Sequence, residues 1–308
     1  MTGTHNSRIP KMRQRCFFVA VGLAVLVCVG AAQAQQSDTV PFVIPGDDSS
    51  KTATDFSGLI PAPVAADFNT VRDGRFYVGE RRLKFWGVNL CFGGNFPSHE
   101  EADKIAPHFA KLGINAVRFH HMDGQDAPNG IWKTLPTGKR VFDDKQIDRL
   151  DYFLNRLHEN GIYANINLHV SRTLSEGEGF PKNKPSAQWW AASNKWVTYY
   201  DPDVQAELKK FCKDLMTHEN PYRKLKRVDD PGIAVVEMLN ENYFSKQGID
   251  LLQHLPDRFV KSFSVAWNGW LKQKYKSSDA MVEGWKEGHI GLGAVSYTHL
   301  TLPTILLV

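Results

Sequence analysis

Four short runs of mostly apolar residues organise the chain, and the last three end in polar residues. The runs are Leu83–Leu90, Ile114–His120, Ile162–His169 and Gly232–Glu241. Short aliphatic runs of this kind, bounded by turn or breaker residues, are typical of strands that are buried on both faces of a parallel sheet. We therefore predict four strands, the last of which follows Pro231 and ends in Asn240-Glu241.

A helical pattern follows each of these runs. The first helix opens with the capping box Ser98-His99-Glu100-Glu101 and runs to about Leu112. The second covers residues 144–161, with leucines on one stripe, and the third begins at Asp201-Pro202, an N-cap followed by proline. The fourth covers about Asp257–Tyr275.

Strand and helix therefore alternate four times without a return hairpin, which predicts an α/β fold with a parallel sheet. A doubly wound sheet is the competing architecture, but no strand is followed by a Gly-rich phosphate turn. Polar residues instead end the second, third and fourth strands, as they do at the mouth of a (β/α)8 TIM barrel, where several strand ends meet at one site. These residues are Arg118, His120, His169, Asn240 and Glu241.

The chain begins with features of a targeting segment. Residues 1–34 combine a basic start, the apolar stretch Phe17–Gly30 and the small-residue motif Ala32-Gln33-Ala34, which predicts a cleaved signal peptide and a secreted or periplasmic protein. Residues 35–63 are rich in Ser, Thr, Asp and Pro and are predicted to be a linker. Order is expected from about Phe68, with a hairpin at Asp73-Gly74.

Loss of this leader changes the charge of the protein. The net charge of +4 comes from 37 basic and 33 acidic residues, and four of the basic residues lie in the leader, which leaves 33 of each. A basic pI is then no indication of a nucleic-acid partner. Of the four cysteines, Cys91 and Cys212 remain; they either pair in an oxidising compartment or stay free, and two cysteines form no metal site.

Several segments together resemble the clan A glycoside hydrolases, and most closely the cellulase-like family 5. They are WGVNL at Trp86–Leu90, NAVRFHH at Asn115–His121, INLHV at Ile166–Val170 and LNEN at Leu239–Asn242. WNGWLKQKY at Trp267–Tyr275 also resembles a helix of related barrel β-galactosidases. The resemblance extends from about Phe76 to Gly288.

This resemblance implies a retaining glycoside hydrolase that cleaves β-glycosidic bonds in poly- or oligosaccharides without a cofactor. Glu241 would be the general acid/base, which must be protonated to donate to the leaving oxygen. Asn240 would bind a sugar hydroxyl, Arg118 would orient the nucleophile, and His169 would line the reactive subsite. The full set of substrate-binding candidates is Asn240, Arg118, His169, His120, Tyr243 and Trp190.

Each of these residues also has a purely structural interpretation. Glu241 can simply cap a loop, Arg118 can pair with a structural acid, and the histidines can be core residues. Glu237 shares strand parity with Glu241 but lies deeper, so we interpret it as a core-layer or supporting group. A metal site at His120, His121 and Asp123 is not expected, because adjacent residues on a strand point to opposite faces.

Aromatic residues are concentrated in the loops after the second and third strands. Sugar rings stack well on aromatic faces, so these residues are candidate platforms, although any one of them can instead pack its loop. They are Trp132, Trp189, Trp190, Trp196, Tyr199 and Tyr200.

Two expected parts of such an enzyme are not found in the sequence. A full barrel has eight strands in roughly 250 residues, whereas the pattern gives four, and no strand carries the second glutamate, the nucleophile. Residues 294–308 resemble translated sequencing adapter and are expected to be a non-native tail. We therefore expect residues 64–293 to be the N-terminal part of a glycosidase barrel, inactive alone. A non-catalytic carbohydrate-binding barrel is the alternative function.

Overall fold

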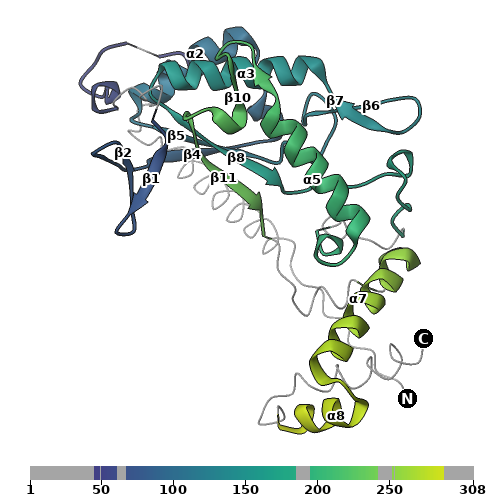
Figure 1. Ribbon diagram of the computed structural model, residues 1–308. Helices are drawn as coiled ribbons and strands as arrows, with labels where there is room; N and C mark the ends of the chain where they lie inside the picture. The colour runs from purple at the N-terminus through teal and green to yellow at the C-terminus, as the bar shows by residue number, and fades with distance from the viewer. Residues whose placement is uncertain are drawn as a thin grey trace, which may run out of the picture. The chain divides into compact units, whose positions relative to one another are not determined.

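The computed structural model describes residues 45–48, 50–60, 67–184, 195–241, 252 and 254–287. The chain divides into two compact units, residues 1–45 and 46–308, and all elements described below belong to the second unit. A four-stranded sheet lies at its centre, in the order β11-β8-β5-β4 (Figure 1). All three pairings are parallel, so the predicted parallel sheet is confirmed. Its strands are β4 (Gly87–Cys91), β5 (Ala116–His120), β8 (Tyr163–His169) and β11 (Ile233–Leu239).

Helices begin close to where the sequence predicts them. The capping box of α2 is formed, because the Ser98 hydroxyl accepts from the Glu101 N–H at 3.2 Å and the Ser98 N–H donates to the Glu101 carboxylate at 2.7 Å. Asp201 accepts from the first-turn N–H groups of α5. The helices are α2 (His99–Lys111), α3 (Asp144–Glu159), α5 (Pro202–Thr217), α7 (Asp257–Tyr275) and α8 (Ser278–Glu287).

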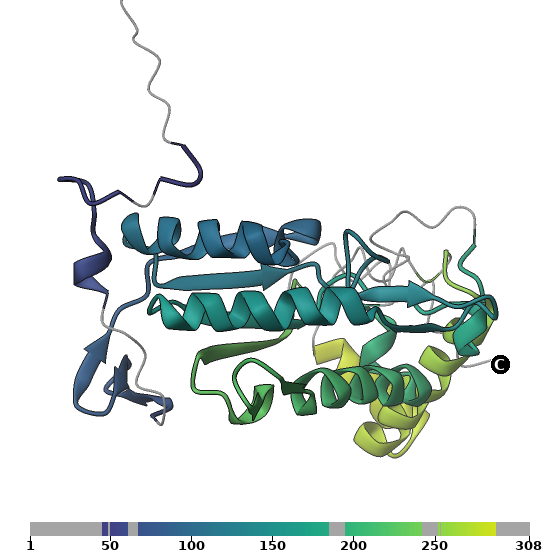
Figure 2. The same cartoon turned by 90° about the horizontal axis from the view of Figure 1, so that it is seen from above.

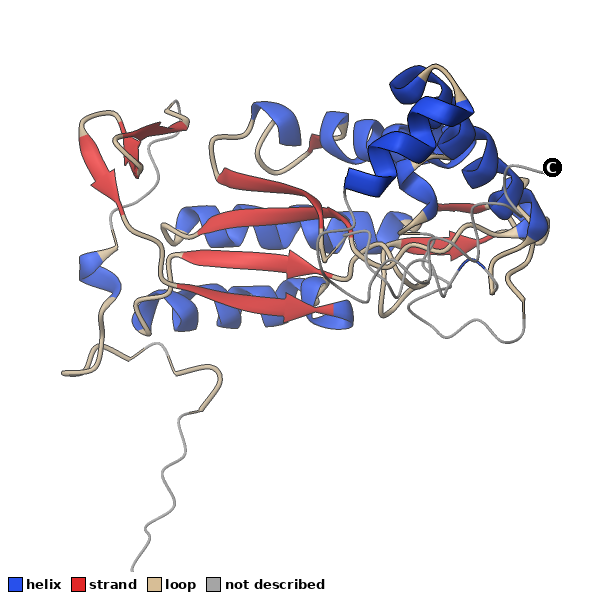
Figure 3. Ribbon diagram, turned by 90° about the horizontal axis from the view of Figure 1, so that it is seen from below, coloured by secondary structure: helices blue, strands red, loops and turns tan. Residues whose placement is uncertain are grey.

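The main core lies between the sheet and the helices α2, α3 and α5. Figure 2 shows α2 and α3 side by side along the sheet. Side chains alternate along a strand, so Val117 and Phe119 of β5 and Ile166 of β8 face this core, where Phe119 contacts Phe153 of α3 with ring centroids 5.8 Å apart. The residues between them face the other way. We call this second side the open face, and Figure 3 shows the strands from it.

Smaller elements surround the central sheet. The predicted hairpin at Asp73-Gly74 is confirmed, as it joins the first two strands of an antiparallel sheet. Its strands are β1 (Asn69–Arg72), β2 (Arg75–Val78) and β3 (Arg81–Leu83), while β6 (Trp132–Thr134) pairs with β7 (Arg140–Phe142) and β9 (Glu219–Asn220) with β10 (Leu225–Lys226). Short 3₁₀ helices are η1 (Ser57–Leu59), η2 (Phe92–Asn95), η3 (Glu176–Glu178), η4 (Val197–Tyr199) and η5 (Arg227–Asp229).

The predicted first strand, residues 83–90, is wrong as a single element. Leu83 ends β3, where it pairs antiparallel with Phe76, whereas Gly87 begins β4, which pairs in parallel with β5. The two ladders belong to separate sheets, and residues 84–86 between them are not in strand conformation. Gly87 also sits close to β5, because a Cβ there would lie 3.0 Å from the Ala116 carbonyl oxygen.

The prediction that the last strand is buried on both faces is also wrong. β11 lies at the edge of the sheet, and Met238 is 65% exposed and Val236 40% exposed. Among the described residues, no strand pairs with the outer edge of β11. Its aliphatic sequence is therefore buried only along the side that contacts β8.

Part of the predicted linker is attached to α2. The Lys111 ammonium lies 2.6 Å from the Asp48 carboxylate, and the Phe56 N–H donates to the Lys111 carbonyl at 2.8 Å. Structure therefore begins earlier than the expected start near Phe68. Of the helices in the described ranges, none is both long enough and apolar enough to cross a membrane.

Candidate active site

Arg118 is the centre of a polar group on the open face. It lies on β5 between the core residues Val117 and Phe119, so the strand alternation directs its side chain away from α2 and α3. Its Nε donates to Glu237 Oε2 at 2.9 Å and its Nη2 to Glu237 Oε1 at 2.7 Å. Nη2 also donates to Asn240 Oδ1 at 2.8 Å, and Nη1 to Asn89 Oδ1 at 3.1 Å. One guanidinium thus joins β4, β5 and β11.

A second chain of hydrogen bonds links the same carboxylate to His120. Asn167 on β8 donates its Nδ2 to Glu237 Oε2 at 2.7 Å, which leaves its Oδ1 to accept from His120 Nδ1 at 2.6 Å. In this arrangement the proton lies on Nδ1 of His120. The Asn95 amide fixes the same residue by donating to the His120 carbonyl at 2.7 Å.

Glu237 is the acid that contacts Arg118 in this chain. Hydrogen bonding from Arg118 outweighs the effect of partial burial and, with Asn167, lowers the pKa of Glu237. The family resemblance implied that Arg118 orients the catalytic nucleophile, and Glu237 was interpreted as a core-layer or supporting group. The observed contact is the alternative of Arg118 paired with a structural acid, and it keeps Glu237 ionised.

Glu241 follows this group directly and is exposed. Asn240 closes β11 by donating its N–H to the His169 carbonyl at 3.0 Å, and Glu241 then has a left-handed backbone with φ 49°. This turn directs the chain away from the strand immediately after Asn240. Glu241 thus follows the C-terminal end of the sheet, and its carboxylate is close enough to His121 and Lys195 to act on their pKa values.

Lys195 is a site residue that the sequence reasoning missed, as it also missed Asn89 and Asn167. Its ammonium donates to the Asn240 carbonyl at 3.0 Å. Burial lowers the pKa of Lys195, while the carboxylates of Glu241 and Asp123 act in the opposite direction. Lys195 comes from the long loop after β8, 45 residues before Asn240. No local pattern in the sequence marks it.

His169 and Asp123 form a buried pair beside these strand ends. Asp123 Oδ2 accepts from His169 Nδ1 at 3.2 Å and from the N–H groups of Val170 and Arg172 at 2.8 and 2.9 Å. Burial acts to raise the pKa of Asp123, but these hydrogen bonds hold it below its usual value. His169 is 3% exposed. It reaches the Arg118 group through its backbone carbonyl, which accepts from Asn240.

The expectation that His120 and His121 point to opposite faces is wrong. Their ring centroids are 4.2 Å apart, because β5 ends at His120 and His121 has φ 58°, outside the strand conformation. His121 hydrogen-bonds Ser171 through Nδ1 at 2.9 Å, and burial followed by the charge of His120 lowers its pKa. Within the described part of the chain, no three His, Cys, Asp or Glu side chains are placed to hold a metal ion.

The aromatic residues predicted as sugar platforms differ in how exposed they are. Trp132 and Trp196 are 4% and 7% exposed, so these two pack their loops; Trp132 donates its indole N–H to the Asp123 carbonyl at 2.7 Å. Tyr199 is 45% exposed, and burial raises the pKa of Tyr200. Trp189, Trp190 and Tyr243 lie outside the described residues. Cys91 and Cys212 are both free, and burial raises the pKa of Cys212 to about 11.

Known proteins share limited similarity with this chain. No protein-family model matches it. β-Galactosidase BgaB of Geobacillus sp. (strain Y412MC61) is 20% identical over 208 residues, which are 64% of this chain and 26% of that protein. β-Galactosidase bgaB of Geobacillus kaustophilus is 22% identical over 213 residues, with the same coverage. This chain is therefore similar, at low identity, to one part of these two β-galactosidases. It spans about a quarter of the length of these curated relatives.

Solved structures of glycoside hydrolases are also similar to it. The endo-1,4-β-mannanase from Rhizomucor miehei has 16% identity and a TM-score of 0.46, covering 56% of this chain and 48% of its own. The glycoside hydrolase family 5 mannosidase from the same organism has 16% identity and a TM-score of 0.43, covering 58% and 49%. The endo-β-1,4-mannanase from Thermotoga petrophila has 20% identity and a TM-score of 0.37, covering 60% and 40%.

Proposed function

We propose that the protein carrying this chain is a retaining glycoside hydrolase acting on β-linked poly- or oligosaccharides, with Glu241 as its general acid/base. One observation carries the proposal. The Arg118 guanidinium is hydrogen-bonded to Glu237 and Asn240 at the strand ends, and Glu241 follows Asn240 in the chain. The parallel sheet is then the first half of a (β/α)8 barrel, whose active site lies at the C-terminal ends of its strands.

Glu241 would act twice in each turnover. As an acid it donates its proton to the glycosidic oxygen that leaves, and as a carboxylate it then removes a proton from the attacking water. Its exposure at the sheet end gives a substrate access to the carboxyl group. The Lys195 ammonium at the Asn240 carbonyl would hold the turn on which Glu241 is carried.

The second carboxylate of a retaining mechanism attacks the anomeric carbon and lies about 5–5.5 Å from the acid. We propose that it comes from a later strand, as the family resemblance implies, and that Arg118 orients it. Glu237 is not the proposed nucleophile, because it lies on β11 four residues before Glu241, about 13 Å deeper along an extended chain. In this proposal Glu237 holds the guanidinium in position.

Replacing Glu241 tests this function. Glu241→Gln should lower kcat/KM on a natural β-linked oligosaccharide by about 10²–10⁴-fold, the usual contribution of a general acid/base. Substrates with activated leaving groups should lose less in the first step, since they need little protonation. Glu219 on β9 is also exposed, and Glu219→Gln is the matched control, expected to keep the wild-type rate. Equal rates for both variants would remove Glu241 from the mechanism.

We also propose that the protein is exported and that its leader is cleaved after Ala34. The support is the basic start, the apolar stretch and the Ala32-Gln33-Ala34 motif. The intact mass of exported protein should correspond to a chain that begins at Gln35. Exported protein that keeps Met1 would contradict this.

A further inference from the structure

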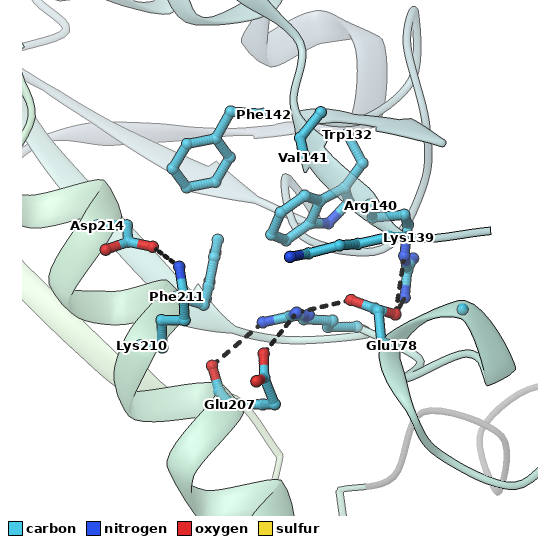
Figure 4. Close-up of a pocket in the computed structure, with 12 residues that line it drawn as sticks. Trp132, Lys139, Arg140, Val141, Phe142, Glu178, Glu207, Lys210, Phe211 and Asp214 are labelled. Carbon is cyan, nitrogen blue, oxygen red and sulfur yellow. Dashed lines mark hydrogen bonds and ion pairs between the residues drawn. The ribbon is translucent and has the colours of Figure 1, made fainter. Parts of the chain in front are cut away.

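A cavity lies away from the polar group around Arg118. It has a volume of about 400 Å³, and its walls come from the β6–β7 hairpin, from the loop that carries η3 and from α5 (Figure 4). None of Arg118, Glu237, Asn240 and Glu241 lines it. Its volume falls within the range of about 300–1,000 Å³ that is typical of small-ligand sites.

One wall of this cavity is aromatic. Trp132 and Phe142 are stacked with ring centroids 5.1 Å apart, and Phe211 of α5 lies 5.2 Å from Trp132 and 6.0 Å from Phe142. Trp132 is buried, whereas Phe142 is only half-buried and so offers part of its surface to the cavity. Such a wall suits the C–H face of a pyranose ring.

Charged residues also line the cavity: the Arg172 guanidinium lies over the Trp132 and Phe211 rings, 4.7 and 5.3 Å from their centroids, and most of the charges are matched. Glu178 is 4% exposed and accepts from Arg140 at 3.2 Å and from Arg172 at 2.9 Å. A second acid, Glu207, lies 3.8 Å from Arg172. Lys210 pairs with Asp214. Two arginines therefore face two glutamates, and one lysine faces one aspartate.

Two donors in this lining are left over. Lys139 is an exposed residue that lines the cavity and, among the described residues, has no acid partner; Figure 4 shows its ammonium directed into the cavity. Arg172 is 6% exposed, and its Nε is buried without a hydrogen-bond acceptor in the described part of the chain. An uncompensated buried donor is costly, so a ligand oxygen that reaches it would be stabilised. The lining thus carries one unmatched positive charge beside an aromatic wall.

We propose that this cavity binds a hexuronate unit of a polysaccharide, with the carboxylate on Lys139 and Arg172 and the ring against Phe142. The choice of a sugar acid over other monoanions rests on the proposed glycoside hydrolase function. A neutral sugar would leave the Lys139 charge unmatched, and a small inorganic anion would leave the aromatic wall uncovered.

The test compares two ligands that differ only in the acid group. Methyl β-D-glucuronide and methyl β-D-glucoside are titrated into the whole protein, and binding is followed by NMR chemical shifts. The glucuronide should bind at least about tenfold more tightly, the difference expected for one charge-assisted hydrogen bond. Lys139→Gln should abolish this preference. Lys133→Gln should keep it, because Lys133 is an exposed lysine of the same hairpin that does not line the cavity.

Equal binding of the two glycosides, absence of binding, or equal losses from the two lysine variants would overturn the proposal. Acetate that binds as tightly as the glucuronide would do the same, since the aromatic wall would then contribute nothing. None of these readouts involves hydrolysis, and the Glu241→Gln assay involves no uronate. Either proposal can therefore fail without the other.

Discussion

Arg118 holds several strand ends together with a single side chain. A guanidinium has five N–H donors in a fixed plane, so it can bind both oxygens of Glu237 and still reach the amide oxygens of Asn240 and Asn89. Lysine has the charge but not this geometry. The position of Asn240, and with it the start of the Glu241 turn, depends on these contacts.

Glu237 gives this group a pH dependence with a defined sign. Its pKa in the folded protein lies below the ordinary value of 4.5, so the ionised form stabilises the fold. That contribution is complete above pH 4.5 and is lost as the pH falls through the lower, folded-state pKa. The melting temperature of the wild type should therefore fall more steeply below pH 4.5 than that of Glu237→Gln.

Other carboxylates also titrate in this range, so the difference between variants is what counts. Glu219→Gln is the control, and its melting temperature should follow the wild type at every pH. If the curve of Glu237→Gln stays parallel to that of the wild type down to pH 2, the ion pair with Arg118 does not stabilise the fold.

Strand parity and strand ends were enough to predict where Arg118 and Asn240 lie in the sheet. Arg118 and Asn240 were expected at the sheet end and are joined there by a hydrogen bond. Lys195 could not be expected, because only the path of the long loop after β8 brings it to Asn240. His121 was misplaced because a positive φ at the end of a strand breaks the alternation, and the sequence gives no sign of it.

At the scale of elements, a buried ion pair connects α3 to the segment after α5. Asp151 of α3 and Arg227 of η5 are each 1% exposed and in direct contact, and His218 Nε2 lies 2.7 Å from the same carboxylate. Arg227 also donates to the Leu215 carbonyl of α5 at 2.8 Å. These contacts fix the entry into β11.

Removing one member of this pair should be strongly destabilising. Arg227→Met leaves Asp151 buried without its arginine, which typically costs about 3–5 kcal/mol. Urea unfolding of the two proteins measures the difference. Arg75 on β2 is exposed, and Arg75→Met should change the free energy of unfolding by less than about 0.5 kcal/mol. A similar small change for Arg227→Met would mean that the pair is not needed for the packing of α3.

Helices were easier to predict than strands, for a local reason. The start of α2 is set by Ser98 and Glu101, two residues three positions apart that contact one another. The break between β3 and β4 is set by partners far along the chain, Phe76 for one and Ala116 for the other. The pairing of β6 with β7 escaped notice because both strands have only three residues.

At the scale of the whole chain, β11 is the most exposed part of the sheet. Met238 and Val236 present apolar surface at an edge that pairs with no strand among the described residues. Such an edge favours association between copies. Met238→Lys should therefore reduce self-association, measured by sedimentation, while Lys133→Met should not reduce it. Unchanged sedimentation of Met238→Lys would show that another surface is responsible.

The parallel sheet could be predicted because four apolar runs alternate with capped helices. The exposure of β11 could not be predicted, because it depends on what lies beside the outer edge of the strand rather than on its own residues. Its sequence is that of an inner strand, yet Met238 is 65% exposed.

The most direct test of the account is azide rescue of Glu241→Ala. In a retaining enzyme that has lost its acid/base, an activated aryl glycoside still forms the glycosyl-enzyme intermediate, and azide attacks it without needing a base. We predict that azide accelerates the variant and that the product is the β-glycosyl azide. An α-glycosyl azide would make Glu241 the nucleophile, and wild-type turnover without azide would show that Glu241 has no role in the reaction.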